Sequence, residues 1–237
     1  EVFIIEVNPR ASRTIPFVSK AIGVPLAKIA ARVMAGKSLK EIGFTKEVKF
    51  SHIAVKESVF PFNKFTDVDV LLGPEMKSTG EVMGIDKTFG RAFAKSQLAT
   101  GIKLPLSGTA FISVKDSDKP KTVKIAQGLQ ELGYRILATS GTAKYLNKND
   151  VTVESINKVK EGSPHCVEGI ESGEINLVIN TVFGEQAIKD SFSLRRGSLN
   201  QNLPYCTTIS GASALLGALK ALKKEDLNIT TIQEYNN

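Results

Sequence analysis

The chain has 237 residues, of which 42% are hydrophobic and 23% are charged, as in ordinary soluble globular proteins. No apolar stretch approaches the roughly 20 residues that a bilayer requires, and no signal-peptide pattern opens the chain, so we expect a cytoplasmic protein without a membrane contact. The net charge is +7, but no basic run with interleaved aromatic residues occurs, and we expect no nucleic-acid partner.

The first hundred residues combine an apolar run with helical periodicity. The chain opens at Glu1 without an initiator Met, and residues 2–7 predict a buried strand. Residues 16–35 carry apolar side chains at spacings of three and four, which predicts one or two helices, with Pro25 opening the second and Gly36 ending it. Residues 48–80 predict strands and loops, and a helix is expected over 89–98.

Beyond residue 101, strands and helices alternate. This alternation predicts a parallel, doubly wound sheet with helices on both faces. We therefore expect an α/β chain with a first domain over residues 1–100 and a second over 101–237, with ligands at the carboxyl ends of the second domain's strands. The expected strands are 109–114, 134–138, 151–154, 175–180 and 205–209, and the expected helices are 119–132, 141–147, 165–172, 186–200 and 210–223.

Four polar side chains near the start of the chain have the pattern of a catalytic site. Glu6 and Asn8 are two residues apart at the end of the expected strand, so their side chains face the same way, and their oxygens suit Mg²⁺. Arg10 and Arg13 offer planar donor groups to phosphate or carbamate oxygens. Residues that cap a loop would explain each one alone, but the combined string favours catalysis.

A second site is expected where the later strands end. Residues 138–142 read A-T-S-G-T, and hydroxyl and backbone N–H groups at a helix N-terminus form an anion site. A Thr N-cap is the commoner explanation of this string alone. Lys119 and Lys158 offer positive charge from other strand–helix junctions, and Asn180 faces the same crevice. Taken together, these residues predict a phosphate site.

Two long strings resemble a known family. Residues 6–30, E-V-N-P-R-A-S-R-T-I-P-F-V-S-K-A-I-G-V-P-L-A-K-I-A, resemble the end of an ATP-grasp domain of the carbamoyl phosphate synthase family, and residues 73–84, G-P-E-M-K-S-T-G-E-V-M-G, are similar to another segment of it. The later part resembles the methylglyoxal-synthase-like allosteric domain that ends the family's large chain. The resemblance implies an ATP-grasp tail over 1–100 and this allosteric domain over 101–237.

The resemblance also implies an activity and partners. The full enzyme would make carbamoyl phosphate from bicarbonate, ammonia released from glutamine, and ATP, for pyrimidine and arginine synthesis. Its partners would be the upstream part of the same large chain and a glutaminase small chain. The ATP-binding lysines and the rest of the metal shell are expected upstream, so we predict no synthetase activity for these residues alone.

The family's site residues map onto this chain by position. Glu6 and Asn8 would hold Mg²⁺ or Mn²⁺ with ATP, while Arg10 and Arg13 would contact the anionic phosphate or carbamate. Val182 and Cys206 depart from polar and acidic residues of the best-known members, which leaves the IMP response and ornithine activation open. The effectors UMP and IMP would contact Lys119, Thr139, Thr142, Lys158, Asn180, Asp190 and Ser191, and ornithine would contact Glu57, Tyr205 and Thr207.

Several alternatives remain open at this point. Glu57 is equally well explained as a surface strand residue. The second domain is compatible with a methylglyoxal-synthase-type lyase acting on a phosphorylated triose, although no acidic residue stands beside Asn180 as a base, and with a purely structural role. Arg195 and Arg196 are typical of surface charge, with an acidic partner or a domain neighbour as the alternative.

Overall fold

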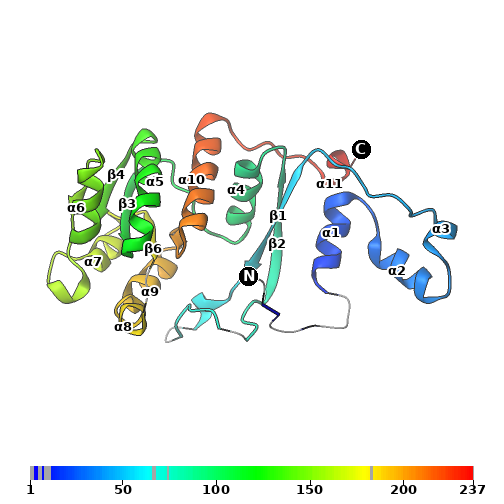
Figure 1. The fold of residues 1–237 in the computed structure, drawn as a ribbon, viewed down its shortest axis with the longest axis horizontal. Helices are drawn as coiled ribbons and strands as arrows, with labels where there is room; N and C mark the ends of the chain where they lie inside the picture. The colour runs from blue at the N-terminus through cyan, green and yellow to red at the C-terminus, as the bar shows by residue number, and fades with distance from the viewer. Residues whose placement is uncertain are drawn as a thin grey trace.

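A computed structural model describes residues 3, 4, 7, 12–65, 68–73, 75–181 and 184–236. Figure 1 shows an elongated molecule, with a five-stranded sheet and its helices at one end and helices α1 (Thr14–Ile22), α2 (Leu26–Met34) and α3 (Leu39–Ile42) at the other. Between the two ends lie an antiparallel pair of strands, β1 (Ile53–Val59) and β2 (Gly80–Asp86), and helix α4 (Phe89–Ala99). Helix α4 packs on the strand pair and on α10 (Ile209–Lys224), so it connects the two ends.

The N-terminal helices agree with the sequence in part. Pro25 immediately precedes α2, as predicted, whereas α3 was not predicted although Ser38 and Glu41 form its capping box. Among the described residues, no single helix could cross a bilayer; α1 and α2 have the required length and composition only as a pair, which bends by 116°.

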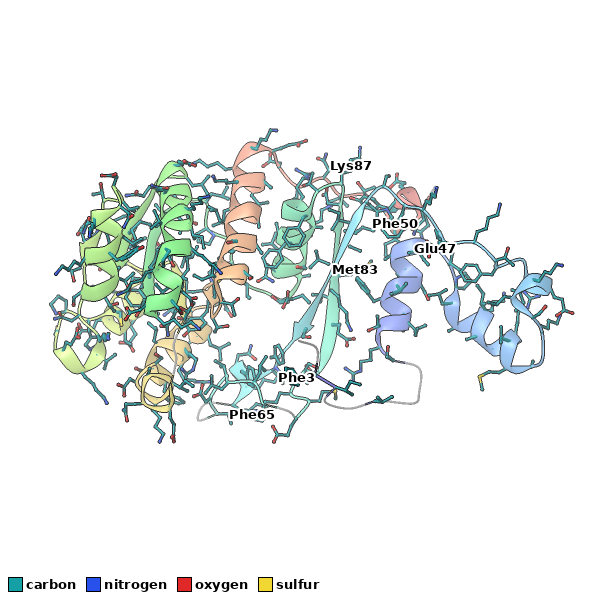
Figure 2. All side chains as sticks on the ribbon, in the orientation of Figure 1. Phe3, Glu47, Phe50, Phe65, Met83 and Lys87 are labelled. Atoms are coloured by element: carbon teal, nitrogen blue, oxygen red, sulfur yellow. The ribbon has the colours of Figure 1, made fainter. Side chains whose placement is uncertain are left out.

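The expected strand over 2–7 is wrong for the residues that the structure describes. Phe3, Ile4 and Val7 are not in a strand, and their side chains are 78%, 83% and 78% exposed. Within the described part of the chain no strand pairs with these three residues. Phe50 and Phe65 are exposed as well, at opposite ends of the β1–β2 pair (Figure 2).

The C-terminal part is a five-stranded parallel sheet, as predicted. The strand order is β5-β4-β3-β6-β7. The chain moves from the central strand β3 outward through β4 and β5, and then returns to the other side of β3 for β6 and β7. The strands are β3 (Gly108–Val114), β4 (Tyr134–Ala138), β5 (Glu154–Ser155), β6 (Leu177–Thr181) and β7 (Tyr205–Cys206).

Helices cover both faces of this sheet because its strands alternate between two apolar layers. Ala110 and Ile112 of β3 face one core with α5 (Lys119–Glu131), α6 (Ser140–Lys148) and α10. Phe111, between them, faces the other core with α7 (Cys166–Glu171) and α9 (Phe192–Asn200). Strands buried on both faces are nearly continuous apolar runs, which explains why they were recognisable in the sequence.

Two predicted elements differ from the observed ones. The strand expected over 151–154 is reduced to Glu154–Ser155, because the Asn147 side chain binds both backbone groups of Val153 (3.0 and 3.1 Å) in place of a neighbouring strand. The helix expected over 186–200 is broken at Ser191 into α8 (Glu185–Asp190) and α9. The Ser191 hydroxyl donates to the carbonyl of Ala187 (2.9 Å), in the helix turn before the break.

The C-terminal segment returns to the first helices. It ends in α11 (Ile232–Tyr235), and the Asn236 amide donates to the carbonyl of Lys20 at the end of α1 (3.1 Å). His52 is buried between these elements: one ring nitrogen lies 2.6 Å from the carbonyl oxygen of Ala21, and the ring meets Tyr235 edge-on. This segment, for which the sequence predicted no element, connects residues 232–236 to the N-terminal part.

Candidate functional site

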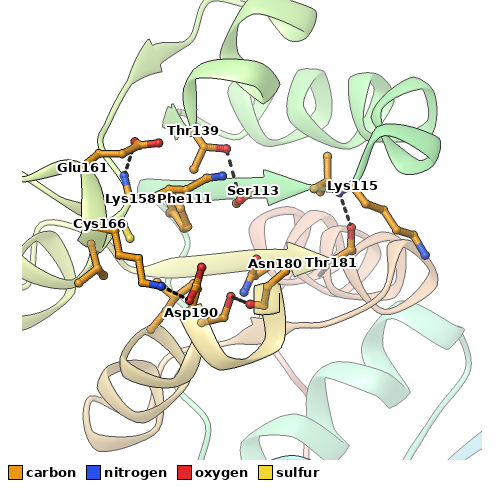
Figure 3. A pocket seen from close by; sticks show the side chains of 16 residues that line it. Phe111, Ser113, Lys115, Thr139, Lys158, Glu161, Cys166, Asn180, Thr181 and Asp190 are labelled. Carbon is orange, nitrogen blue, oxygen red and sulfur yellow. Dashed lines mark hydrogen bonds and ion pairs between the residues drawn. The ribbon is translucent and has the colours of Figure 1, made fainter. Parts of the chain in front are cut away.

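A cavity of about 450 Å³ opens at the carboxyl ends of the parallel strands (Figure 3). It lies where β3 and β6 are neighbours and the chain leaves them toward opposite sides of the sheet, which is the place where open α/β sheets bind ligands. Ser113 comes from β3, Asn180 and Thr181 from β6, and Thr139 from the turn after β4. The side chains of the last three are almost fully buried, so the strand ends supply polar groups that bulk water barely reaches.

One end of the cavity suits an anion. Thr139 is the N-cap of α6, but its side chain makes no capping bond; its hydroxyl lies 3.3 Å from that of Ser113. The Thr142 N–H donates to the Thr139 carbonyl (2.8 Å), whereas the N–H groups of Ser140 and Gly141 precede the first intrahelical bonds of α6. A Cβ at Gly141 would lie 3.5 Å from the Lys119 ammonium nitrogen, so this cation stands beside the helix start. Backbone donors, a hydroxyl and a cation together favour a negatively charged group there.

Two predicted residues, Thr142 and Lys119, lie near this end of the cavity but do not line it. The Thr142 hydroxyl accepts a hydrogen bond from the backbone N–H of Val114 (3.3 Å), which holds α6 against β3. Lys119 forms an ion pair with the exposed Asp116 (2.7 Å). A ligand anion at the helix start would therefore compete with Asp116 for the Lys119 ammonium group.

The opposite wall comes from the 3-10 helix η3 (Val159–Glu161) and from α8. The residues that line this wall are Lys158, Lys160, Glu161, Asp190 and Ser191, of which Figure 3 labels Lys158, Glu161 and Asp190. Lys160 lies 2.6 Å from Asp190 and, together with a hydrogen bond from Gln186, holds the pKa of Asp190 below its usual range. The wall therefore carries both signs of charge.

The cavity floor is apolar. Phe111, Leu194 and Cys166 line it, and burial raises the pKa of the Cys166 thiol to about 11, so this cysteine is a neutral thiol at pH 7. Ser113 and Lys115 also line the cavity, at the end of the central strand β3, and neither was predicted from the sequence. The rule that ligands bind at the carboxyl ends of strands would have identified them.

A second, smaller cavity of about 230 Å³ lies between the N-terminal and C-terminal parts. Glu57 of β1 and Tyr205 of β7 line it together with Arg195, whereas Thr207 is exposed and outside its lining. Burial raises the pKa of Glu57, and the groups that oppose this shift are the neutral amide of Gln97 (3.0 Å) and a backbone N–H. Arg195 in the same lining is engaged by Asp69, and among the described residues no ion pair involves Glu57. This half-buried carboxylate therefore suits an ammonium ligand better than it suits a solvated strand surface.

The two cavities share a hydrogen bond. The Asn180 amide, in the wall of the larger cavity, donates to the Tyr205 hydroxyl in the wall of the smaller one (2.8 Å). Burial raises the pKa of Tyr205, so its hydroxyl stays protonated at neutral pH. This hydrogen bond thus fixes the orientation of one side chain in each cavity.

The expectation of surface charge at Arg195 and Arg196 is wrong. Arg195 is 2% exposed and holds both carboxylate oxygens of Asp69 (2.8 and 2.5 Å). Arg196 is buried as well and donates to the carbonyls of Phe62 and Val68 (both 3.2 Å). Both arginines bind the segment that follows β1. They therefore contact the neighbouring part of the molecule, which was the alternative to surface charge.

Comparison with known proteins assigns both parts of the chain. Residues 121–207 match the MGS-like domain, and residues 1–42 match the ATP-binding domain of the carbamoyl-phosphate synthase L chain. The carbamoyl phosphate synthase large chain of Myxococcus xanthus is 57% identical over 234 residues, 99% of this chain and 22% of the relative. The same-named protein of Methanosarcina acetivorans is 49% identical over 237 residues, 100% of this chain and 22% of the relative. The chain belongs to the carbamoyl phosphate synthase large-chain family. It spans about a fifth of the length of these relatives.

The ATP-binding region of this family is described only in part. The predicted metal ligands Glu6 and Asn8, and the predicted catalytic Arg10, lie outside the described residues, as does Val182. Arg13 precedes α1 and lines a cavity of about 320 Å³ beside the ion pair of Lys56 and Glu81 (3.3 Å). Across the described ranges, no cluster of three His, Cys, Asp or Glu side chains could hold a metal ion.

Proposed function

We propose that residues 101–237 form a regulatory domain that binds a nucleoside monophosphate, UMP or IMP, in the larger cavity. The observation that carries this proposal is the polarity of the cavity at the switch point. Its α6 end offers donors and a cation to a phosphate, and its α8 end offers the acceptor oxygens of Asp190. The volume, about 450 Å³, lies within the range of small-molecule pockets.

The rest of the proposal concerns the whole enzyme. Residues 1–100 are the C-terminal part of an ATP-grasp domain, and the full large chain is a ligase that uses ATP with Mg²⁺ or Mn²⁺ and receives ammonia from a glutaminase small chain. Glu6 and Asn8 would hold the metal ions, which neutralise phosphate charge when bound, while Arg10 and Arg13 orient the acceptor. The chain alone, without the upstream residues of its relatives, is inactive as a synthetase.

Regulation in this proposal requires that an effector bind two states of the enzyme with different affinity. The smaller cavity offers a second effector site, in which Glu57 and Tyr205 would hold the ammonium group of ornithine, with Thr207 outside the cavity lining. The supporting observation is the raised pKa of the Glu57 carboxyl, which a bound cation would lower again.

Calorimetric titration of the purified chain tests nucleotide binding. We expect saturable UMP binding that Lys158→Met weakens about tenfold, because a charge-assisted contact is lost. Lys148→Met is the matched control, since Lys148 is exposed at the far end of α6. Thr139→Val should also weaken binding, whereas Thr109→Val, at the opposite end of β3, should not.

Two outcomes would count against this proposal. A folded chain that binds neither UMP nor IMP would favour a structural domain. Conversion of dihydroxyacetone phosphate to methylglyoxal would favour the lyase alternative, and we expect none. The carboxylate of Asp190 is held ionised by Lys160 and Gln186, which makes it a weak base.

The Glu57 carboxyl gives a pH-dependent prediction. Since its pKa is raised above 4.5 in the folded state, ionisation of Glu57 opposes folding at neutral pH and has no cost below pH 4.5. Glu57→Gln should therefore raise the melting temperature at pH 7 by a few degrees, and the gain should vanish below pH 4.5. Glu81→Gln, which removes the partner of Lys56, should give no such gain. Thermal unfolding between pH 3 and pH 8 measures the difference, and a gain that does not depend on pH would refute this explanation.

A further inference from the structure

One ion pair joins two segments that line the larger cavity. The Lys160 ammonium nitrogen, from η3, lies 2.6 Å from Oδ1 of Asp190, the last residue of α8 (Figure 3 labels Asp190). Gln186, one turn earlier on α8, donates to the same oxygen (2.7 Å). In the described part of the chain, both contacts end on Oδ1, so Oδ2 keeps its capacity to accept hydrogen bonds.

Packing alone does not hold Asp190 in place. Helix α8 has six residues, and none of them is buried. Arg195 of α9 holds the backbone of α8 at the Ile188 carbonyl (2.9 Å). The Asp190 carboxylate itself, among the described residues, is held by Gln186 of the same helix and by Lys160 from outside it. Because the side chains are 68% and 38% exposed, the pair contributes little to folding stability, so its removal leaves the domain folded.

We propose that Lys160 is a positioning residue for the sugar end of the nucleotide site. It fixes the Asp190 carboxylate so that Oδ2 accepts hydrogen bonds from ligand hydroxyl groups. The inference rests on the proposed nucleotide-binding function. It goes beyond that function because it names a residue that determines which end of the cavity receives the sugar of the nucleotide.

The chemistry of a carboxylate sets the direction of the ligand. An ionised Asp accepts hydrogen bonds and donates none, so it offers no donor to the oxygens of a phosphate group. The phosphate is therefore directed to the α6 end, beside Thr139 and the helix start, and the hydroxyl-bearing sugar to the α8 end. Without Lys160, the carboxylate loses its fixed orientation, and the sugar loses an acceptor while the phosphate keeps its donors.

Isothermal titration of the purified chain with UMP, with 2′-deoxy-UMP and with inorganic phosphate tests this role. Lys160→Met should weaken UMP binding about fivefold, should reduce the preference for UMP over 2′-deoxy-UMP, and should leave phosphate binding unchanged. Lys160→Arg should restore UMP affinity because it keeps the charge. The control is Lys189→Met, since Lys189 pairs with Glu185 on the same helix (2.9 Å) but does not line the cavity.

Each outcome decides a separate question. If Lys160→Met binds UMP as tightly as the unchanged protein and keeps the same preference, Lys160 has no positioning role. If Lys160→Met weakens UMP and phosphate equally, Lys160 acts as a general cation, and the inference is again wrong. If the unchanged protein binds neither UMP nor phosphate, the proposed nucleotide site fails, and this inference fails with it.

Discussion

Replacing Arg195 with methionine is expected to lower the free energy of unfolding by about 3 kcal/mol. The substitution keeps much of the side-chain volume but leaves the Asp69 carboxylate without the guanidinium that binds both of its oxygens. Burial opposes ionisation of Asp69, and the hydrogen bonds and charge of Arg195 outweigh it, which holds the pKa of this carboxyl below its usual range. Removing one partner of a buried ion pair costs more folding free energy than the intact pair contributes, because the other charge stays buried without its partner.

The exposed Arg135 is the matched control for Arg195. It also holds a carboxylate with two bonds, to Glu154 (2.7 and 2.5 Å), and it contacts Glu174 (2.7 Å), but its side chain is 46% exposed. Arg135→Met should cost less than about 1 kcal/mol. Equal losses for the two variants in urea unfolding would show that burial does not decide the effect.

The effect of Arg195→Met should also depend on pH. Because the Asp69 pKa is lowered in the folded state, the pair stabilises the protein above the ordinary Asp pKa of 3.8, and this contribution is lost as the pH falls through the folded pKa. The stability difference between Arg195→Met and the unchanged protein should therefore be full at pH 7 and shrink below pH 3.8. A difference that persists at low pH would point to lost packing instead.

The sheet could be predicted from the sequence because burial on both faces leaves a local signature. Strands such as β6 are apolar up to the polar residues at their carboxyl ends, and Gly and Pro separate them from amphipathic helices, so periodicity locates them. Because the strands are parallel, the side chains at their carboxyl ends lie at the same edge of the sheet. Thr139, Lys158 and Asn180 were chosen at strand–helix junctions, whereas Asp190 and Ser191 came from the family resemblance, and all five line one cavity. Lys119 and Thr142, predicted with them, do not line it.

The contacts that could not be predicted join residues far apart in the chain. Arg195 has the sequence pattern of surface charge because its partner, Asp69, belongs to the other part of the molecule. Lys160 could not be distinguished from other exposed lysines until Asp190 was placed opposite it. The apolar residues Val33 and Met34 show the converse difficulty: α2 has a clear apolar stripe, yet none of its residues is buried in the described part of the chain.

Gly84→Ala is expected to destabilise the N-terminal part by about 3 kcal/mol. Gly84 is buried in β2, directly under α4. A Cβ there would lie 1.9 Å from the carbonyl oxygen of Ala92 and 2.5 Å from the backbone nitrogen of Ser96. Both atoms belong to the helix backbone and cannot rotate away as a side chain would, so α4 must shift.

Gly80 provides the matched control in the same strand. A Cβ at Gly80 would meet no atom within 4 Å, and its φ is not in the left-handed region. Gly80→Ala should be neutral or slightly stabilising, because alanine restricts the unfolded chain more than glycine does. Similar losses in the two variants would show that strand conformation, rather than contact with α4, requires glycine.

The Gly84 substitution also tests whether the C-terminal part is an independent domain. The buried residues of its two apolar cores all lie between Ala110 and Leu219, so these cores need no side chain from β1 or β2. Gly84→Ala should therefore lower the melting temperature of a first transition and leave UMP binding within about twofold of that of the unchanged protein. If UMP binding and the whole fold are lost in one transition, α4, which packs on both the strand pair and α10, joins the two parts into one cooperative unit.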